Sequence, residues 1–178
     1  MSSYDENAEA TGKYMNSFIE AAGEVSSVFE KRTREMFEKH LGEVEPDGWY
    51  RLGDVAKAFT EIREEVGAQT MKRGGEAAGD ALPFPEDTSL EDAIEMLVET
   101  NQEVYRNSDM KNPAGTYLYE IDGRSARLAV DEGYPLTQPF AKGVYTALIN
   151  DYGPADALPS FEEAEPEGDE QFAWEVTW

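Results

Sequence analysis

The chain has 178 residues, of which 40% are apolar, so it suits a single domain with a hydrophobic core. Its 38 acidic and 15 basic side chains give a formal net charge of −23. Phosphate binding requires a clustered basic footprint, so the scattered cations argue against a nucleic-acid partner. The absence of cysteine excludes disulfides, thiolate metal sites and cysteine nucleophiles. No stretch approaches 18 apolar residues, and no charged segment precedes an apolar core as in a secretory signal, so we expect a cytoplasmic location and no membrane association.

The first part of the chain, to about residue 110, has helical periodicity. Residues 1–10 are polar and are expected to be flexible, and residues 11–178 are expected to form a single domain. One long helical pattern covers 11–41, and a second covers 54–66 with Gly67 as its expected stop. A weak, glycine-containing helical pattern then follows over 68–81.

A capping box at Ser89 opens a further helix that is predicted to run to about Arg106. After residue 115 the periodicity changes from helical to two, which indicates strands. Asp122-Gly123 predicts a two-residue hairpin loop, with Tyr119 opposite Ala126. Thr137 begins another helix, and two strands over 160–165 and 171–178 end the chain.

These elements predict an α+β fold in which the N-terminal helices (about 11–110) pack on an antiparallel sheet. The sheet part, about 115–178, has the order hairpin, helix, hairpin.

Two features of the sheet part are candidates for ligand binding. Arg124 and Arg127 stand on the hairpin, where Arg127 either forms an ion pair with Glu120 or recognises an anionic or carbonyl group. The aromatic side chains either fill the core or line a pocket between sheet and helices. The candidate ligand-binding residues are Arg124, Arg127, Tyr117, Tyr119, Tyr105, Phe140, Tyr145 and Trp174.

Catalytic and metal motifs are missing from the sequence. His40 is the only histidine, and its place at the end of a helix suits a favourable interaction with the helix dipole. The remaining interpretations of His40 are a haem ligand or a general base. No phosphate-binding loop, EF-hand or zinc motif is present, so we predict no catalytic residue and no metal site.

The C-terminal part carries a family resemblance. This part resembles a superfamily of small sensors in three features: the order of its segments, an aromatic-x-x-Gly-Val motif in the helix and an aromatic-rich last strand. The segments that carry the resemblance are GTYLYEIDGRSARLAV, PFAKGVYTALINDYG and FAWEVTW. That superfamily includes haem-based nitric-oxide/oxygen-binding domains and vinyl-reductase-type small-molecule-binding domains, and the resemblance covers about 115–178. It implies a sensory role.

The haem-binding branch of that superfamily has a histidine on a helix before the sheet and a Tyr-x-Ser-x-Arg motif that holds the haem propionates. Ser125 and Arg127 match the end of the motif, whereas Gly123 stands at the tyrosine position. Since His40 is distant from this region, no cofactor is predicted, and a haem would depend on His40 alone.

Three functions follow in order of preference. The first is a non-catalytic sensory or small-ligand-binding domain that acts on partner proteins. The second is a structural or signalling-interaction protein with a filled core, which could pair with a second copy through the helix over 11–41. The third is an enzyme that would use carboxylates, tyrosine or arginine.

The even spread of the acids along the chain indicates a solvated surface and resembles the composition of haloarchaeal cytoplasmic proteins. We therefore expect a halophilic protein that loses structure when salt is lowered from molar to millimolar concentration, because self-repulsion is then no longer screened. Circular dichroism and the melting temperature across that range test this. Unchanged values would contradict it.

Overall fold

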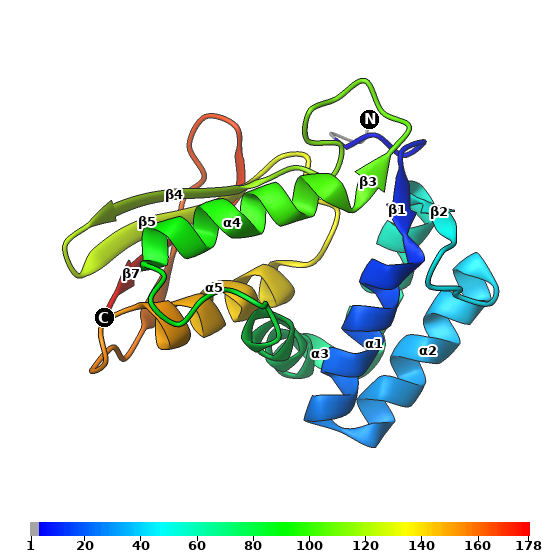
Figure 1. Ribbon diagram of the computed structural model, residues 1–178, viewed down its shortest axis with the longest axis horizontal. Helices are drawn as coiled ribbons and strands as arrows, with labels where there is room; N and C mark the ends of the chain where they lie inside the picture. The colour runs from blue at the N-terminus through cyan, green and yellow to red at the C-terminus, as the bar shows by residue number, and fades with distance from the viewer. Residues whose placement is uncertain (1–3) are drawn as a thin grey trace.

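The computed structural model describes residues 4–178, so residues 1–3 of the segment expected to be flexible lie outside it (Figure 1). A helical part and a four-stranded sheet part lie next to each other, and α3 and α5 meet between them. The elements in chain order are β1 (Glu9–Thr11), α1 (Gly12–Val25), α2 (Ser27–Leu41), β2 (Trp49–Arg51), α3 (Leu52–Asp80), α4 (Leu90–Glu103), β3 (Tyr105–Arg106), β4 (Tyr117–Asp122), β5 (Ser125–Asp131), α5 (Gln138–Tyr152), β6 (Ser160–Ala164) and β7 (Glu170–Thr177). The predicted α+β class is confirmed.

The long helix expected over 11–41 is two helices. Ser26 has an extended backbone (φ −167°, ψ 152°), and its side-chain oxygen accepts a hydrogen bond from the Phe29 N–H at 3.0 Å. A serine that caps a new helix ends the previous one, because its backbone leaves the helical region. The two helices therefore pack against each other within one chain.

The stop predicted at Gly67 is confirmed as a break inside α3. Gly67 has φ +82° and ψ 163°, which side chains with a Cβ rarely adopt, and helical backbone lies on both sides of it. The glycine-containing pattern that follows is a helix as well. Its Gly75 and Gly79 are buried against α5.

A small sheet in the order β2-β1-β3 is a feature that the sequence did not predict. Ala10 pairs with Tyr50 on one side and with Tyr105 on the other. Tyr105 was predicted in the preceding helix, but α4 ends at Glu103 and the chain enters β3. Residues 9 and 10, expected to be flexible, are thus held in the middle strand.

The main sheet is antiparallel, in the order β4-β5-β7-β6. The predicted register of its first hairpin is wrong by two residues, because Tyr119 pairs with Leu128 and the loop consists of Gly123 and Arg124. Gly123 has φ +62°, the conformation that a type II′ turn requires at its first central position. A shift of two keeps every side chain on its predicted face, since side chains alternate with period two.

Two helices, α4 and α5, contact the inner side of this sheet (Figure 1). Leu128, Tyr145, Leu148 and Trp174 have no exposed area there, so the layer between α5 and the sheet is filled. No helix among residues 4–178 is both long enough and apolar enough to cross a bilayer.

The crossing of α3 and α5 joins the two parts of the fold. A Cβ on Gly143 of α5 would overlap the Lys72 carbonyl oxygen of α3, and one on Gly75 would overlap the Phe140 carbonyl oxygen. The backbones of α3 and α5 therefore touch directly at this crossing, which only glycine allows.

We predict that Gly143→Ala lowers the free energy of unfolding by about 3 kcal/mol, because the methyl group forces the two backbones apart. Urea denaturation at constant salt measures it. As a control, Gly23→Ala in α1 places its Cβ against only the flexible Glu30 carboxylate, so it should stabilise by up to about 1 kcal/mol. Equal effects of the two changes would contradict the importance of the crossing.

Candidate functional site

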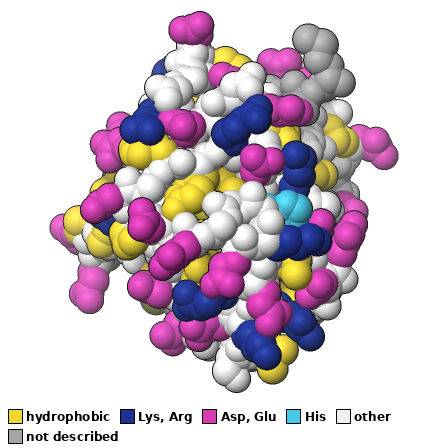
Figure 2. Space-filling view, turned by 90° about the vertical axis from the view of Figure 1, so that its right-hand side faces the viewer, with side chains coloured by type: hydrophobic (Ala, Val, Ile, Leu, Met, Phe, Trp, Pro, Cys, Tyr) yellow, Lys and Arg dark blue, Asp and Glu magenta, His cyan; other side chains and the backbone are white. Residues whose placement is uncertain are grey.

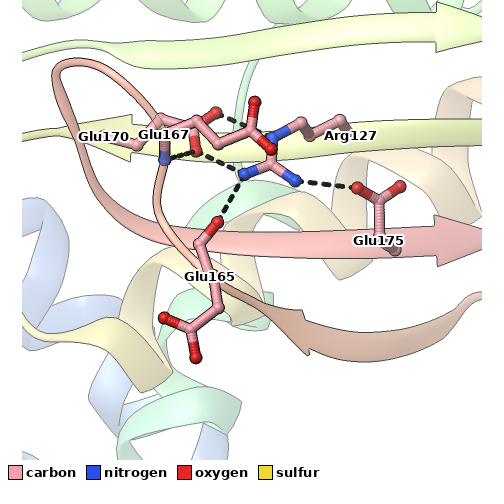
Figure 3. Close-up of polar contacts among 5 residues, drawn as sticks. All are labelled: Arg127, Glu165, Glu167, Glu170 and Glu175. Carbon is pink, nitrogen blue, oxygen red and sulfur yellow. Dashed lines mark hydrogen bonds and ion pairs between the residues drawn. The ribbon is translucent and has the colours of Figure 1, made fainter.

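Arg127 was predicted to bind a ligand, but its guanidinium is hydrogen-bonded to groups of its own chain (Figure 3). Its Nε and Nη2 donate to the Glu170 carboxylate at 3.0 and 2.6 Å, and its Nη1 donates to Glu175 at 2.8 Å. Nη2 also donates to the Glu165 carbonyl oxygen at 2.8 Å. The guanidinium ties the β6–β7 connection to the sheet, on the face opposite the aromatic layer. The alternative ion pair with Glu120, its neighbour across the β4–β5 ladder, is not formed.

The second predicted cation, Arg124, is likewise bound within the chain. It donates to the Trp178 carbonyl oxygen at 2.6 Å and to the Asp156 carboxylate at 3.0 Å. The side chains of Arg124 and Asp156 are more than half exposed. The structure therefore uses both hairpin arginines as ties on the sheet, and neither faces the aromatic layer.

The predicted aromatic residues separate into different environments. Phe140 lies on the helical side, with ring centroids 5.3 Å from Phe18 and 5.9 Å from Phe59. Trp174 is buried beside Tyr145. Tyr119 lies at the sheet edge, where its hydroxyl donates to Glu95 of α4 at 2.9 Å.

The other predicted tyrosines belong to a group that we call the tyrosine cluster: Tyr14, Tyr105, Tyr117, Tyr134 and Tyr145. Its members come from α1, β3, β4, the 132–137 loop and α5, so they join the helical part to the sheet. The hydroxyls of Tyr117 and Tyr134 are 3.1 Å apart, and the rings of Tyr117 and Tyr145 have centroids 5.3 Å apart. The Tyr145 hydroxyl lies 2.7 Å from the Leu118 carbonyl oxygen.

These phenols are neutral hydrogen-bonding groups. Burial raises the pKa of Tyr117 to about 12 and the pKa values of Tyr134 and Tyr145 well above the ordinary value. Tyr14 and Tyr105 are half-buried residues, yet burial also raises the pKa of both. Their hydroxyls therefore lie deeper than the exposed area of the residues suggests, and deprotonation is disfavoured throughout the cluster.

Tyr14 and Tyr134 were not predicted as site residues. Tyr14 shares the apolar stripe of the first helix, which makes it look like ordinary core. Tyr134 stands in a loop before Pro135, where no periodicity applies. Only the tertiary structure brings them to Tyr105 and Tyr117.

An open cleft of about 1050 Å³ lies beside the cluster and shares Tyr134 with it. One wall is the first half of α3, and the other is the loop and first turn of α5 together with the start of β7. The lining residues are Tyr4, Ala56, Lys57, Thr60, Glu61, Arg63, Glu64, Glu132, Tyr134, Pro135, Leu136, Thr137, Gln138, Pro139, Glu170, Gln171 and Phe172. Ligand sites in proteins have about 300–1,000 Å³, so the cleft has room for a small molecule.

The histidine belongs to a different element from the members of the tyrosine cluster. His40 is at the end of α2, with its Nε2 3.2 Å from a Glu61 carboxylate oxygen that also accepts from Lys39. Figure 2 shows the histidine at the molecular surface, among lysine, arginine and acidic side chains. The two neighbouring basic groups hold the pKa of Glu61 below its usual value.

We predict that Arg127→Gln lowers the free energy of unfolding at neutral pH by about 1 to 2 kcal/mol, since Glu170 loses its charged partner. Arg127 lowers the pKa of Glu170, so this stabilisation is present above the ordinary carboxyl pKa and is lost as pH falls through the lowered value. Denaturation as a function of pH measures both effects. Arg124→Gln, which breaks an exposed pair, is the control and should change stability by less than about 1 kcal/mol. Equal, small effects would mean that Arg127 is not a structural tie.

Comparison with known proteins identifies the fold. No protein-family model and no curated protein sequence matches the chain. Several solved structures do, among them an oxygen-binding H-NOX domain related to soluble guanylate cyclases (TM-score 0.62, 13% identity, 94% of each chain covered). Others are a mutant of the T. tengcongensis H-NOX protein (TM-score 0.60, 10% identity, 94% of this chain and 96% of that one) and a mutant of the Fe(II) unliganded H-NOX protein from K. algicida (TM-score 0.58, 12% identity, 94% of this chain and 95% of that one).

The sequence resemblance was confined to about 115–178, whereas the structural likeness covers 94% of the chain. The N-terminal helices therefore belong to the same architecture as the sheet. At 10–13% identity this likeness establishes the fold and not the ligand. The chain has the H-NOX fold along almost all of its length.

Proposed function

We propose that this chain is a non-catalytic sensory domain that binds a small ligand in the cleft between α3 and the 132–139 segment. The observation that carries the proposal is the position of the cleft, whose walls come from both parts of the fold. A ligand there touches α3 and the segment that leads into α5. Because the backbones of these two helices are in direct contact at Gly75 and Gly143, a change in one wall reaches the other.

Tyr134 supplies a path from the cleft to the interior. It lines the cleft, and its hydroxyl bonds to that of Tyr117, whose ring packs on Tyr145 of α5. A ligand that moves Tyr134 therefore acts on buried contacts between helices and sheet. Packed interiors respond to such changes by discrete rearrangement, which suits a signalling role through partner proteins.

We infer that the H-NOX fold is used here without a haem, because the residues present do not fit one. His40 lies at the end of α2 with its Nε2 3.2 Å from a Glu61 carboxylate oxygen, whereas the tyrosine cluster comes from α1, β3, β4, the 132–137 loop and α5. Tyrosine binds haem iron as well, but burial raises the pKa of Tyr14 and its neighbours and so disfavours the tyrosinate. Arg127, which the sequence resemblance would place on the propionates, is saturated by Glu170 and Glu175.

A non-catalytic role is supported by the lack of converging reactive groups. Within residues 4–178, no three histidine or acidic side chains gather in a metal-binding arrangement. The tyrosine cluster offers neutral hydrogen-bond donors and acceptors in an apolar layer, which suits binding and not proton transfer at neutral pH.

The second candidate is a signalling-interaction protein without a ligand. The filled layer between α5 and the sheet, where Tyr145 and Trp174 have no exposed area, favours it. On this alternative the cleft is part of a surface for a protein partner, and no small molecule accompanies the purified chain.

Native mass spectrometry of protein purified at high ionic strength tests the proposal. We expect a bound small molecule with a mass other than that of haem, and we expect its loss in Thr60→Trp. Thr60 is exposed and lines the cleft, so the indole occupies the space without entering the core. Thr100→Trp, at an exposed helical position outside the cleft, is the matched control and should keep the ligand.

Two outcomes would contradict the proposal. A haem at one per chain, with its absorption band, would overturn the inference that the fold is used without one. A wild-type protein that carries no small molecule and acquires none from a metabolite library would favour the interaction protein.

A further inference from the structure

The cleft contains one cation that the rest of the described chain leaves unpaired. Lys57 donates to Asp54 at 3.0 Å, whereas no residue in the described part of the chain forms an ion pair or hydrogen bond with Arg63. In a chain of net charge −23, carboxylates outnumber cations by 38 to 15, so a free guanidinium is unexpected. Its freedom requires a local reason.

That reason lies in the sequence around Arg63. Side chains three and four positions apart are the neighbours on a helix, and for Arg63 these are Phe59, Thr60, Val66 and Gly67, which carry no charge. Five other helical cations have an acid at this spacing and pair with it: Lys31 and Arg32 with Glu35, Arg34 with Glu30, Lys57 with Asp54, and Lys72 with Glu76. Glu61, two positions before Arg63, is engaged by Lys39 and His40.

A second free arginine shows the contrast. Arg73 also forms no ion pair or hydrogen bond within residues 4–178, but the small hollow that it lines contains Glu24, Glu76 and Asp80. Glu76 is engaged by Lys72, so the carboxylates of Glu24 and Asp80 remain beside Arg73. Arg63 lines a cleft in which Glu61 and Glu170 are engaged by other cations and whose second wall includes the uncharged residues Pro135, Leu136 and Pro139.

From this arrangement we infer that Arg63 binds the anionic group of the ligand, which is an organic monoanion such as a carboxylate on an apolar body. The inference rests on the proposed function of the cleft. Guanidinium offers a planar fork of donors that matches a carboxylate, and the apolar wall suits the body of the molecule. The exposed carboxylates of Glu64 and Glu132, which also line the cleft, disfavour a ligand with several negative charges.

The opposite wall adds an uncharged polar group. Thr137 precedes α5, but its side chain makes no capping hydrogen bond, and its hydroxyl is buried without a partner. A buried hydroxyl without a partner carries a free-energy cost that a polar ligand atom can remove. Arg63 on α3 and Thr137 before α5 therefore define the two polar contacts that we expect of a bound monoanion.

Nuclear magnetic resonance with benzoate as the probe tests the inference. The side-chain Nε–H signal of Arg63 is assigned from its absence in Arg63→Gln, and titrations are run at about 1 M salt, where the screening length of about 3 Å removes long-range effects. We expect a saturable shift of this signal with benzoate and at least about tenfold weaker binding of benzamide, its neutral counterpart. Inorganic phosphate, mostly dianionic above neutral pH, should bind more weakly than benzoate.

Arg63→Gln should weaken benzoate binding at least about tenfold, and Arg73→Gln, the control at the other free arginine, should leave it unchanged. Circular dichroism establishes that both variants are folded. Equal binding of benzoate and benzamide, or the absence of a saturable Arg63 shift with benzoate, would overturn the inference. If Thr60→Trp abolishes benzamide binding while Arg63→Gln has no effect, the monoanion assignment fails and the cleft remains a ligand site.

Discussion

The contact between α3 and α5 is the constraint on which the rest of this structure depends. It joins the helical part to the sheet part, and at Gly75 and Gly143 the two backbones meet with no side chain between them. Such an approach leaves little freedom in the relative position of the two parts. The cleft owes its shape to it, because α3 continues from this crossing through the break at Gly67 into one wall, and the other wall leads directly into α5. On the proposed function, a ligand bound in the cleft would act on this connection between the two parts of the fold.

The polar interior follows from the same arrangement. Five tyrosines from five segments meet where the two parts join, and hydrogen bonds between Tyr117 and Tyr134 and from Tyr145 to the sheet backbone satisfy the hydroxyls of these three residues. Neutral phenols can be buried at lower free-energy cost than charged groups, which explains why the cations of this chain lie at the surface instead. The fold shared with H-NOX domains therefore contains, in this chain, a cluster of neutral phenols where its two parts join.

The charges of the chain separate into structural and available groups. Arg127 and Arg124 looked available in the sequence, but both are engaged by carboxylates and carbonyl oxygens near the β6–β7 connection and the end of the chain. Arg63 was not predicted as a site residue from the sequence. It forms no ion pair or hydrogen bond within residues 4–178, and its helical neighbours are uncharged. In an acidic protein most basic side chains form ion pairs within the chain. A basic side chain without such a partner is therefore a better indication of a binding site than the mere presence of a basic residue.

The sequence by itself determined the local structure. Periodicity, capping serines and turn glycines were sufficient for the α+β class, for most helices and strands and for the break at Gly67, since these depend on neighbours a few residues apart. It also placed each hairpin side chain on the correct face, even though the register of Tyr119 was wrong by two. The tertiary structure alone decided the small sheet around β1, the meeting of Tyr14 with Tyr105, and the pairing of Arg127. These contacts join segments up to about a hundred residues apart, and no local pattern encodes which distant partner a tyrosine or an arginine will meet.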